Sequence, residues 1–401
     1  MSEWKKMKLE EICLSISDGD HQPPPKSNTG VAFITISDID SQNQINFDNV
    51  MHVPQEYYDS LDSKRKAQVG DILYSVVGSF GIPVIVKEPR QFVFQRHIAI
   101  LRPDKERVIP GFLYYAMLNR DFYQRADMVA IGSAQRTISL SSLRDMVLTI
   151  PDIAIQEAVA NRLSAYDDLI ENNNRQIKLL EEAAQRLFKE WFVDLHFPGY
   201  ENCRIVDGLP EGWHKDAVDS KISLLSGYAF KSSDFVDKGQ YKIVTIKNVK
   251  DGDFDGNNVS LIDEIPLKMP QHCLLEEGDI LLSLTGNVGR VCLVYGDNYL
   301  LNQRVAKLKS DIPGFAYCLF RSRDMFDEMN NLANGAAQQN LSPIRTGKVE
   351  VCFPSDDIIQ RFETTVKPMI DQEIELNKMN VVLTEARDRL LPKLMSGEIE
   401  V

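Results

Sequence analysis

The sequence predicts a mixed α/β (α+β) protein in which one globular domain occurs twice and each copy is followed by a long helix. Two observations lead to this prediction. A Gly-rich string of twelve residues occurs twice, as GDILYSVVGSFG at 70–81 and as GDILLSLTGNVG at 278–289. After each copy, apolar residues recur at alternating spacings of three and four, which is the pattern of a coiled-coil helix.

The repeat extends well beyond this string. Seven of the twelve positions are identical, and Gln95-Arg96 matches Gln303-Arg304 at the same offset of 208 residues. GSAQ at 132–135 matches GAAQ at 335–338 at an offset of 203 residues. Because self-similarity at a nearly fixed offset marks a repeated structural unit, we expect a tandem duplication of about 200 residues.

Short runs rich in β-branched residues predict strands in both copies. AFITIS and PVIVKE in the first copy, and KIVTIKNV and RVCLVYG in the second, are punctuated by Gly, Pro, Asn and Asp. The repeated Gly-rich string is expected to form a strand and a tight turn with glycines at positive φ. It does not match the G-x-x-x-x-G-K-[ST] pattern of a nucleotide-phosphate loop.

The long helices are expected to pair with each other. The seam of the first helix recurs in the second at an offset of 204 residues, so the two apolar stripes can be buried against one another. We therefore expect two long antiparallel coiled-coil helices that separate the globular domains about a pseudo-two-fold axis. The residues expected to pair the helices are Tyr166, Ile170, Asn173, Ile177, Leu180, Leu187, Ile370, Ile374, Asn377, Val381 and Leu390.

Asn173 and Asn377 occupy equivalent positions in the two seams. A polar residue in a seam typically fixes the register of the helices at some cost in stability, and this is the role expected for both asparagines. The alternative is an amphipathic helix that lies on its own domain. With pairing, the expected boundaries are a first domain at 1–152, a helix at 153–194, a linker at 195–212, a second domain at 213–355 and a helix at 356–401.

The net charge of −13 is concentrated on the helical segments. Residues 1–150 hold 18 acidic and 17 basic side chains, and residues 211–354 hold 19 and 16, so both globular domains are nearly neutral. Local basic faces for phosphate binding are therefore compatible with the composition. No stretch approaches about eighteen consecutive apolar residues, so we expect no membrane association and a cytoplasmic location.

Four strings together resemble the specificity (S) subunit of a type I restriction-modification system, and the resemblance covers nearly the whole chain. LPEGW at 209–213 resembles the usual entry into the second domain, and LLPKLMSGEI at 390–399 is similar to the C-terminal signature. SGYAFKSSDF at 226–235 and SDGDHQPPP at 17–25 resemble two versions of a loop of the recognition domains. Asp20 and Pro23 depart from that loop pattern.

The resemblance implies that the two globular domains are target recognition domains, each reading one half of a gapped double-stranded DNA sequence. It also implies that the paired helices dock two modification (methyltransferase) subunits, to which restriction/translocase subunits are added. S-adenosylmethionine, ATP and Mg²⁺ would then belong to those partner subunits. We expect no catalytic residue, cofactor or metal in this chain, and the Asn/Asp-Pro-Pro-Tyr/Phe string of amino-methyltransferases is absent from the sequence.

Candidate DNA contacts are polar side chains in loops, because Arg and Lys recognise guanine and Asn and Gln recognise adenine. The difference between Arg136 and Gln339, at equivalent places, could carry a difference between half-sites. The candidates are His21, Lys26, Gln95, Arg96, His97, Ser133, Gln135, Arg136, Thr137, Tyr228, Lys231, Gln303, Arg304, Gln338, Gln339 and Asn340. Hydrogen bonds that brace the loops are the competing interpretation of these residues.

Three other functions remain open from the sequence. One is an enzyme on DNA, such as a fused methyltransferase, against which the missing motifs argue. Another is a duplicated protein-interaction scaffold that does not bind DNA, for which duplex binding would be absent or insensitive to salt. The third is a specificity subunit of a related system whose partner fuses nuclease and methyltransferase, a difference that lies in the partner.

Overall fold

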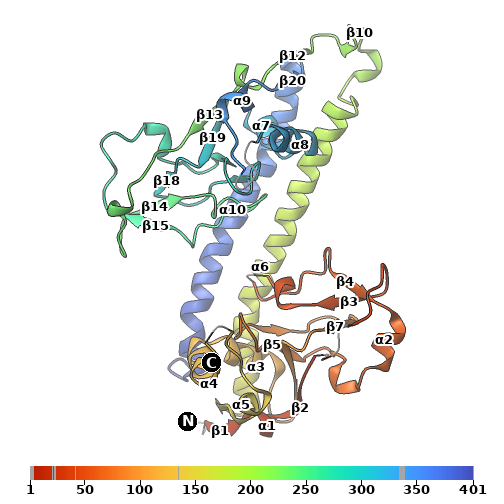
Figure 1. Cartoon of the computed structure of the whole chain (residues 1–401), viewed down its shortest axis with the longest axis vertical. Coiled ribbons are helices and arrows are strands. Elements are labelled where there is room, and N and C mark those ends of the chain that lie inside the picture. The colour runs from red at the N-terminus through yellow and green to blue at the C-terminus, as the bar shows by residue number, and fades with distance from the viewer. Residues whose placement is uncertain are drawn as a thin grey trace. The chain divides into compact units, whose positions relative to one another are not determined.

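The computed structural model describes residues 4–19, 21, 24–40, 42–133, 135–333 and 339–400. The chain forms two compact units (Figure 1). Unit 1 comprises Met1–Leu169 and Leu383–Val401, and unit 2 comprises Ile170–Val382. The two long helices, α6 (Ile153–Phe188) and α10 (Asp356–Met395), each contribute a segment to both units.

Unit 1 is built on three small sheets. The largest is antiparallel and has the strand order β2 (Cys13–Asp18), β8 (Ile98–Pro103), β5 (Ile72–Ser75), β6 (Pro83–Ile85). A second has the order β4 (Met51–Val53), β3 (Val31–Ile34), β7 (Phe92–Phe94), with β3 and β7 parallel. The third pairs β1 (Lys5–Lys8) with β9 (Val147–Ile150).

Short helices fill the connections of unit 1. They are α1 (Leu9–Ile12), α2 (Gln55–Ser60), α3 (Pro110–Leu118), α4 (Arg120–Val129) and α5 (Leu140–Asp145). Pro110 opens α3, where its missing N–H costs nothing and its fixed φ favours the first turn. Phe112 and Leu113 of this helix are fully buried, in a core shared with Leu163 of α6 and Leu394 of α10. The helical pair is therefore an integral part of the core of unit 1.

Unit 2 repeats the same plan. Its four-stranded sheet has the order β13 (Ile222–Ser226), β19 (Val305–Ser310), β16 (Ile280–Ser283), β17 (Val291–Leu293). Its three-stranded sheet has the order β15 (Ser260–Ile262), β14 (Tyr241–Val244), β18 (Tyr299–Leu301), and again two of the strands, β14 and β18, are parallel. The predicted duplication and mixed α/β fold are confirmed.

The remaining elements of unit 2 follow the order of unit 1. β12 (His214–Ala217) pairs with β20 (Glu350–Phe353), and the hairpin β10 (Ile205–Val206) and β11 (Leu209–Pro210) precedes them. The helices are α7 (Pro313–Phe320), α8 (Arg323–Leu332) and α9 (Pro343–Gly347). A π-helical turn at Lys189–Val193 follows α6 directly.

Within each unit, α6 and α10 run antiparallel. In unit 1 the Arg387 guanidinium lies 2.6 Å from the Asp167 carboxylate. In unit 2 the rings of Phe188 and Phe362 lie 6.1 Å apart. Still within unit 2, Asn173 Nδ2 donates to Asn380 Oδ1 over 2.9 Å, so residue numbers rise along one helix as they fall along the other.

The expected pairing residues differ in burial. Asn173, which is 4% exposed, contacts Asn380, and Asn380 in turn donates to Asn174 over 2.7 Å. Asn377 instead donates to the carbonyl of Glu373 in its own helix. Val381 is 40% exposed. Of the other expected residues, Ile170, Ile370 and Ile374 are buried, and Tyr166, Ile177, Leu180, Leu187 and Leu390 are half-buried.

A buried polar network ties the helices of unit 2 to its globular part. Arg321, which follows the last residue of α7, donates to Glu181 of α6 over 2.5 Å and to the Tyr317 hydroxyl over 2.8 Å. That hydroxyl donates to Glu373 of α10 over 3.3 Å, and the exposed Asp251 approaches Arg321 from a loop. The buried Glu373 and the half-buried Glu181 thus lie near one guanidinium. Burial, followed by the charge of Glu181, raises the pKa of Glu373 to about 8.

This pKa predicts that unit 2 loses stability at alkaline pH. The folded pKa of Glu373 is raised from 4.5 to about 8, so the folded chain holds a proton that the unfolded chain releases. Its contribution is complete below pH 4.5 and is lost as the pH rises through about 8. We expect the melting temperature of the wild type to fall between pH 6 and 9, and Glu373→Gln, which stays neutral, to fall less.

The matched control is Glu375→Gln, which removes an exposed carboxylate from the same turn of α10. It should keep the pH dependence of the wild type. The melting temperatures are measured by circular dichroism across this pH range. If they fall equally for the wild type and for Glu373→Gln, the raised pKa of Glu373 is contradicted.

Candidate nucleic-acid interface

Four loops of unit 1 meet at one end of its four-stranded sheet. They follow β2, connect β5 to β6, connect β7 to β8, and follow α4. Main-chain hydrogen bonds join them: Gly19 N–H to Ile98 O at 3.1 Å, Val76 N–H to His97 O at 2.8 Å, and Gly78 N–H to Arg136 O at 2.9 Å. The candidate loops, scattered in the sequence, therefore form one surface.

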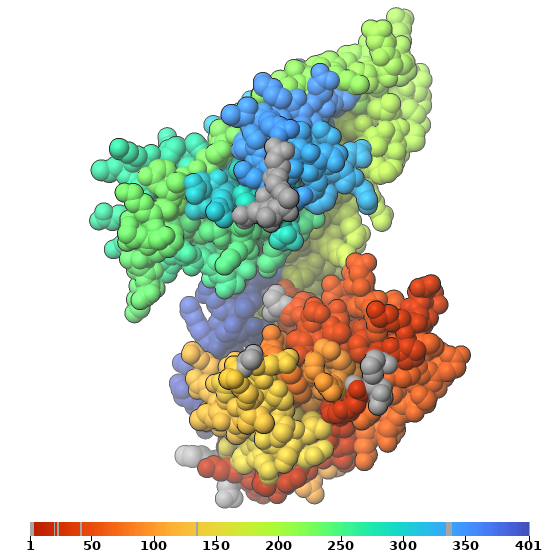
Figure 2. Space-filling model, in the orientation of Figure 1, coloured from red at the N-terminus to blue at the C-terminus, as the bar shows by residue number. Residues whose placement is uncertain are grey.

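Unit 2 contains the same main-chain hydrogen bonds. Gly227 N–H donates to Val305 O at 3.1 Å, Leu284 N–H to Arg304 O at 3.0 Å, and Gly286 N–H to Gln339 O at 3.2 Å. Main-chain groups do not depend on side-chain identity, so the two units can hold different side chains on one backbone arrangement. We call this set of four joined loops the loop frame. The globular part of unit 1 runs from red to yellow in Figure 2 and that of unit 2 from green to blue.

Gly19 and Gly227 make the loop frame possible, because there the backbones touch. A Cβ on Gly19 would lie 2.2 Å from the Phe94 carbonyl oxygen, and a Cβ on Gly227 would lie 2.2 Å from that of Asn302. No side chain fits at such a distance. These two glycines are not among the residues expected from the sequence, although they recur at an offset of 208 residues inside the two resembling loop strings.

The repeated Gly-rich string forms a strand and a tight turn, as predicted. Gly78 and Gly286 have φ of 72° and 76° at the turns. The aspartate of each string is structural: Asp71 lies 2.8 Å from Arg102, and Asp279 lies 2.7 Å from Lys307. These carboxylates also accept main-chain N–H groups three residues earlier, so the string anchors β5 and β16.

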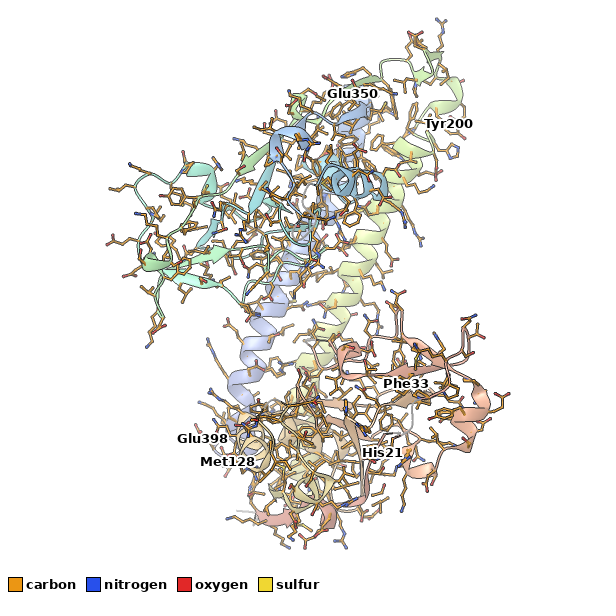
Figure 3. All side chains as sticks on the ribbon, in the orientation of Figure 1. His21, Phe33, Met128, Tyr200, Glu350 and Glu398 are labelled. Carbon is orange, nitrogen blue, oxygen red and sulfur yellow. The ribbon has the colours of Figure 1, made fainter. Side chains whose placement is uncertain are left out.

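The candidates of unit 1 lie on or beside its loop frame. Arg96, Ser133 and Gln135 are exposed, as is Lys26, and Gln95, His97 and Thr137 are half-buried. His21 is at the surface and its imidazole lies 2.7 Å from Asp18 (Figure 3). Burial, together with the nearby Arg96 charge, lowers the pKa of His97, which favours the neutral imidazole.

Arg136 is the most constrained of these side chains. Its guanidinium lies 2.8 Å from the Asp127 carboxylate and donates to the carbonyls of Asp127 and Ala130. It also lies 5.8 Å from the centre of the Phe80 ring. These contacts fasten the loop after α4 to the end of that helix. Asp127 precedes Arg136 by nine residues, and no pattern in the sequence marks the pair.

The candidates of unit 2 occupy the matching surface. Lys231, Gln303, Arg304, Gln339 and Asn340 are exposed. Tyr228 is half-buried against Phe230, and its carbonyl accepts from the Gln303 N–H over 2.9 Å. Asn340 accepts from the Thr285 hydroxyl over 3.3 Å. Gln338 lies outside the described residues.

The structure corrects one match between the repeats. Ile72 of β5 faces Leu101 of β8, and Ile280 of β16 faces Leu308 of β19, so after β7 the offset is 207 residues, not 208. The connection before β7 has six residues (86–91), whereas that before β18 has five (294–298). The identity of Gln95-Arg96 with Gln303-Arg304 was therefore misleading. The equivalent pairs are Gln95 with Asn302, Arg96 with Gln303, and His97 with Arg304.

Among the residues that the structure describes, no group of three or more His, Cys, Asp or Glu side chains could hold a metal ion. Among the same residues, no helix is both long and apolar enough to cross a membrane.

Comparison with known proteins identifies the repeated domain. A family model described as the type I restriction modification DNA specificity domain matches residues 1–182 and again 210–380. The type I restriction enzyme MjaIX specificity subunit of Methanocaldococcus jannaschii is 27% identical over 308 residues, covering 74% of this chain and 71% of that protein. The HindI specificity subunit of Haemophilus influenzae is 24% identical, with both chains fully covered.

A solved structure shares the fold. The crystal structure of a type I restriction-modification system S subunit from M. genitalium has a TM-score of 0.59 and 18% sequence identity, covering 98% of this chain and 96% of that chain.

The close approach at Gly19 and Gly227 gives a direct test of the loop frame. Gly19→Ala or Gly227→Ala should force the backbones apart and destabilise that unit by about 1–3 kcal/mol. Amide hydrogen exchange should become faster in the four loops of the same unit. The control is Gly208→Ala, where φ is 81° but the new Cβ meets nothing within 4 Å. Unchanged exchange in the loops of both glycine variants would show that the backbones are not held together as described.

Proposed function

The chain belongs to the family of type I restriction-modification DNA specificity domains, and we propose that its two loop frames read the two halves of one gapped double-stranded DNA sequence. It is a specificity subunit, which is not catalytic, and enzymatic activity lies on other subunits of the system. It acts with those subunits on DNA.

One observation carries the proposal: the two units present the same loop frame with different side chains. Arg96 corresponds to Gln303 and His97 to Arg304, as the shared hydrogen bonds indicate. Sequence is read by side chains on base edges, whereas main-chain and phosphate contacts only position the protein. Two copies of one scaffold with exchanged Arg and Gln are suited to reading two different half-sites.

We propose that the candidate side chains of each loop frame make the DNA contacts of that unit, except Arg136, whose guanidinium is paired with Asp127. Most of these side chains are exposed Arg, Lys, Gln and Asn, which can reach phosphates and base edges without a rearrangement of the loops. The exposed cationic residues Lys26 and Lys231 follow Gly19 and Gly227 in the sequence and would contribute to phosphate binding and to its salt dependence. The proposed recognition domains are 1–152 and 213–355.

The proposed docking surface for the partners is the helical pair, α6 and α10. In unit 2 its exposed residues include the apolar side chains of Leu179, Met379 and Val382, and apolar surface of this kind is typical of binding sites. We propose two modification (methyltransferase) subunits there, joined by restriction/translocase subunits that use ATP. S-adenosylmethionine and Mg²⁺ would be bound by these partners, and the complex would act on DNA in the cytoplasm. A scaffold that does not bind DNA is not favoured, because both copies match a DNA specificity domain.

The proposal is tested by mapping methylated adenines across a genome. The cognate modification subunit is expressed in a host without adenine methylation, with and without this chain. We expect a gapped two-part motif only when the chain is present, because it supplies both half-sites. Identical maps with and without the chain would remove the DNA-reading role.

A further inference from the structure

Arg96 and Gln303 occupy the same corner of the same turn in the two units. Ile98 N–H donates to Gln95 O over 3.0 Å, and Val305 N–H donates to Asn302 O over 2.9 Å, so each closes a four-residue β-turn. Arg96 and Gln303 are the second residues of these turns. Both side chains are exposed. The connection from β7 to β8, or from β18 to β19, therefore presents one side chain at a fixed corner.

The turn is held on both sides by the loop frame. The carbonyl of its third residue, His97 or Arg304, accepts the N–H of Val76 or Leu284. The carbonyl of its fourth residue, Ile98 or Val305, accepts the N–H of Gly19 or Gly227. Because the backbone is fixed in the same way in both units, Arg96 and Gln303 extend from the same backbone position. A fixed backbone of this kind preorganises a contact and increases its selectivity.

Arg136 is a less suitable reader, although it is also an arginine of the loop frame. Its guanidinium is already paired with Asp127 and with two main-chain carbonyls. A base would have to displace those partners. The structure gives Arg96 no such partner among the described residues, so its donors are available to a ligand.

The two corner side chains have different base chemistry. Arg donates two parallel hydrogen bonds to O6 and N7 of guanine. Gln donates to N7 and accepts from the N6 amino group of adenine. Each such bidentate pair discriminates against the wrong base by roughly 5- to 150-fold.

We propose that this corner determines sequence specificity, with Arg96 binding guanine in the half-site of unit 1 and Gln303 binding adenine in the half-site of unit 2. The inference rests on the proposed function, since it names the bases that two of the DNA-reading side chains select. It assigns Arg136 to positioning of the loop and removes it from base recognition.

Reciprocal substitutions test the assignment. Full-length Arg96→Gln and Gln303→Arg are each expressed with the modification subunit, and methylated adenines are mapped. Arg96→Gln should change one guanine to adenine in one half-site and leave the other half unchanged. Gln303→Arg should change one adenine to guanine in the opposite half-site. Binding to duplexes that carry the old and new base should invert by roughly 5- to 150-fold.

Arg136→Gln is the matched control. It makes the same Arg-to-Gln substitution at an arginine whose guanidinium is paired with Asp127. It should leave the recognised bases unchanged. A base change with Arg136→Gln, or none with either corner variant, would overturn the assignment. Arg96→Gln could instead weaken binding to all duplexes alike and lower by about one the slope of the logarithm of the binding constant against the logarithm of salt concentration. Arg96 would then contact a phosphate, and the assignment would be wrong. Failure of the proposed function can be distinguished from failure of this assignment, because the wild type itself would then give no gapped motif.

Discussion

Main-chain hydrogen bonds hold four loops together in each unit, and the proposed reading of DNA depends on them. They connect the turns after β5 and β7 with the ends of two other loops, and they have the same partners at equivalent positions in unit 2. Because the bonds use only backbone groups, the side chains of the loops were free to diverge after the duplication. The backbone thus holds the loops rigidly while their side chains vary, as a protein that reads two different half-sites requires.

The helices contribute differently to the two units. In unit 1, Asp167 of α6 pairs with Arg387 of α10 and accepts from the Tyr115 hydroxyl of α3, so one carboxylate satisfies two donors. In unit 2, Glu181 and Glu373 share the single guanidinium of Arg321, which leaves one carboxylate without a cation of its own. The two copies thus use the same helical framework with different electrostatics, and in the second copy burial raises the pKa of Glu373 to about 8.

Much of the architecture could be predicted from the sequence, because it follows from periodicity. The duplication, the strands around the Gly-rich string and the two long helices all leave repeating patterns. The register after β7 could not, because one residue is missing from the loop before β18 and chance identity of Gln95-Arg96 with Gln303-Arg304 concealed the shift. The partners of Asn173 and Arg136, Asn380 and Asp127, depend on how the backbone brings side chains together, which no local pattern encodes.

The central claim is that each loop frame reads one half-site. Its most direct test is site-specific photocrosslinking from an unnatural amino acid placed at Gln135 or at Gln339, both of which are exposed on their frames. The full complex is assembled on a duplex carrying the mapped motif, irradiated and sequenced at the crosslinked bases. The account predicts that crosslinks from position 135 fall in one half-site and those from position 339 in the other. Crosslinks from both positions in the same half-site, or in the gap, would contradict it.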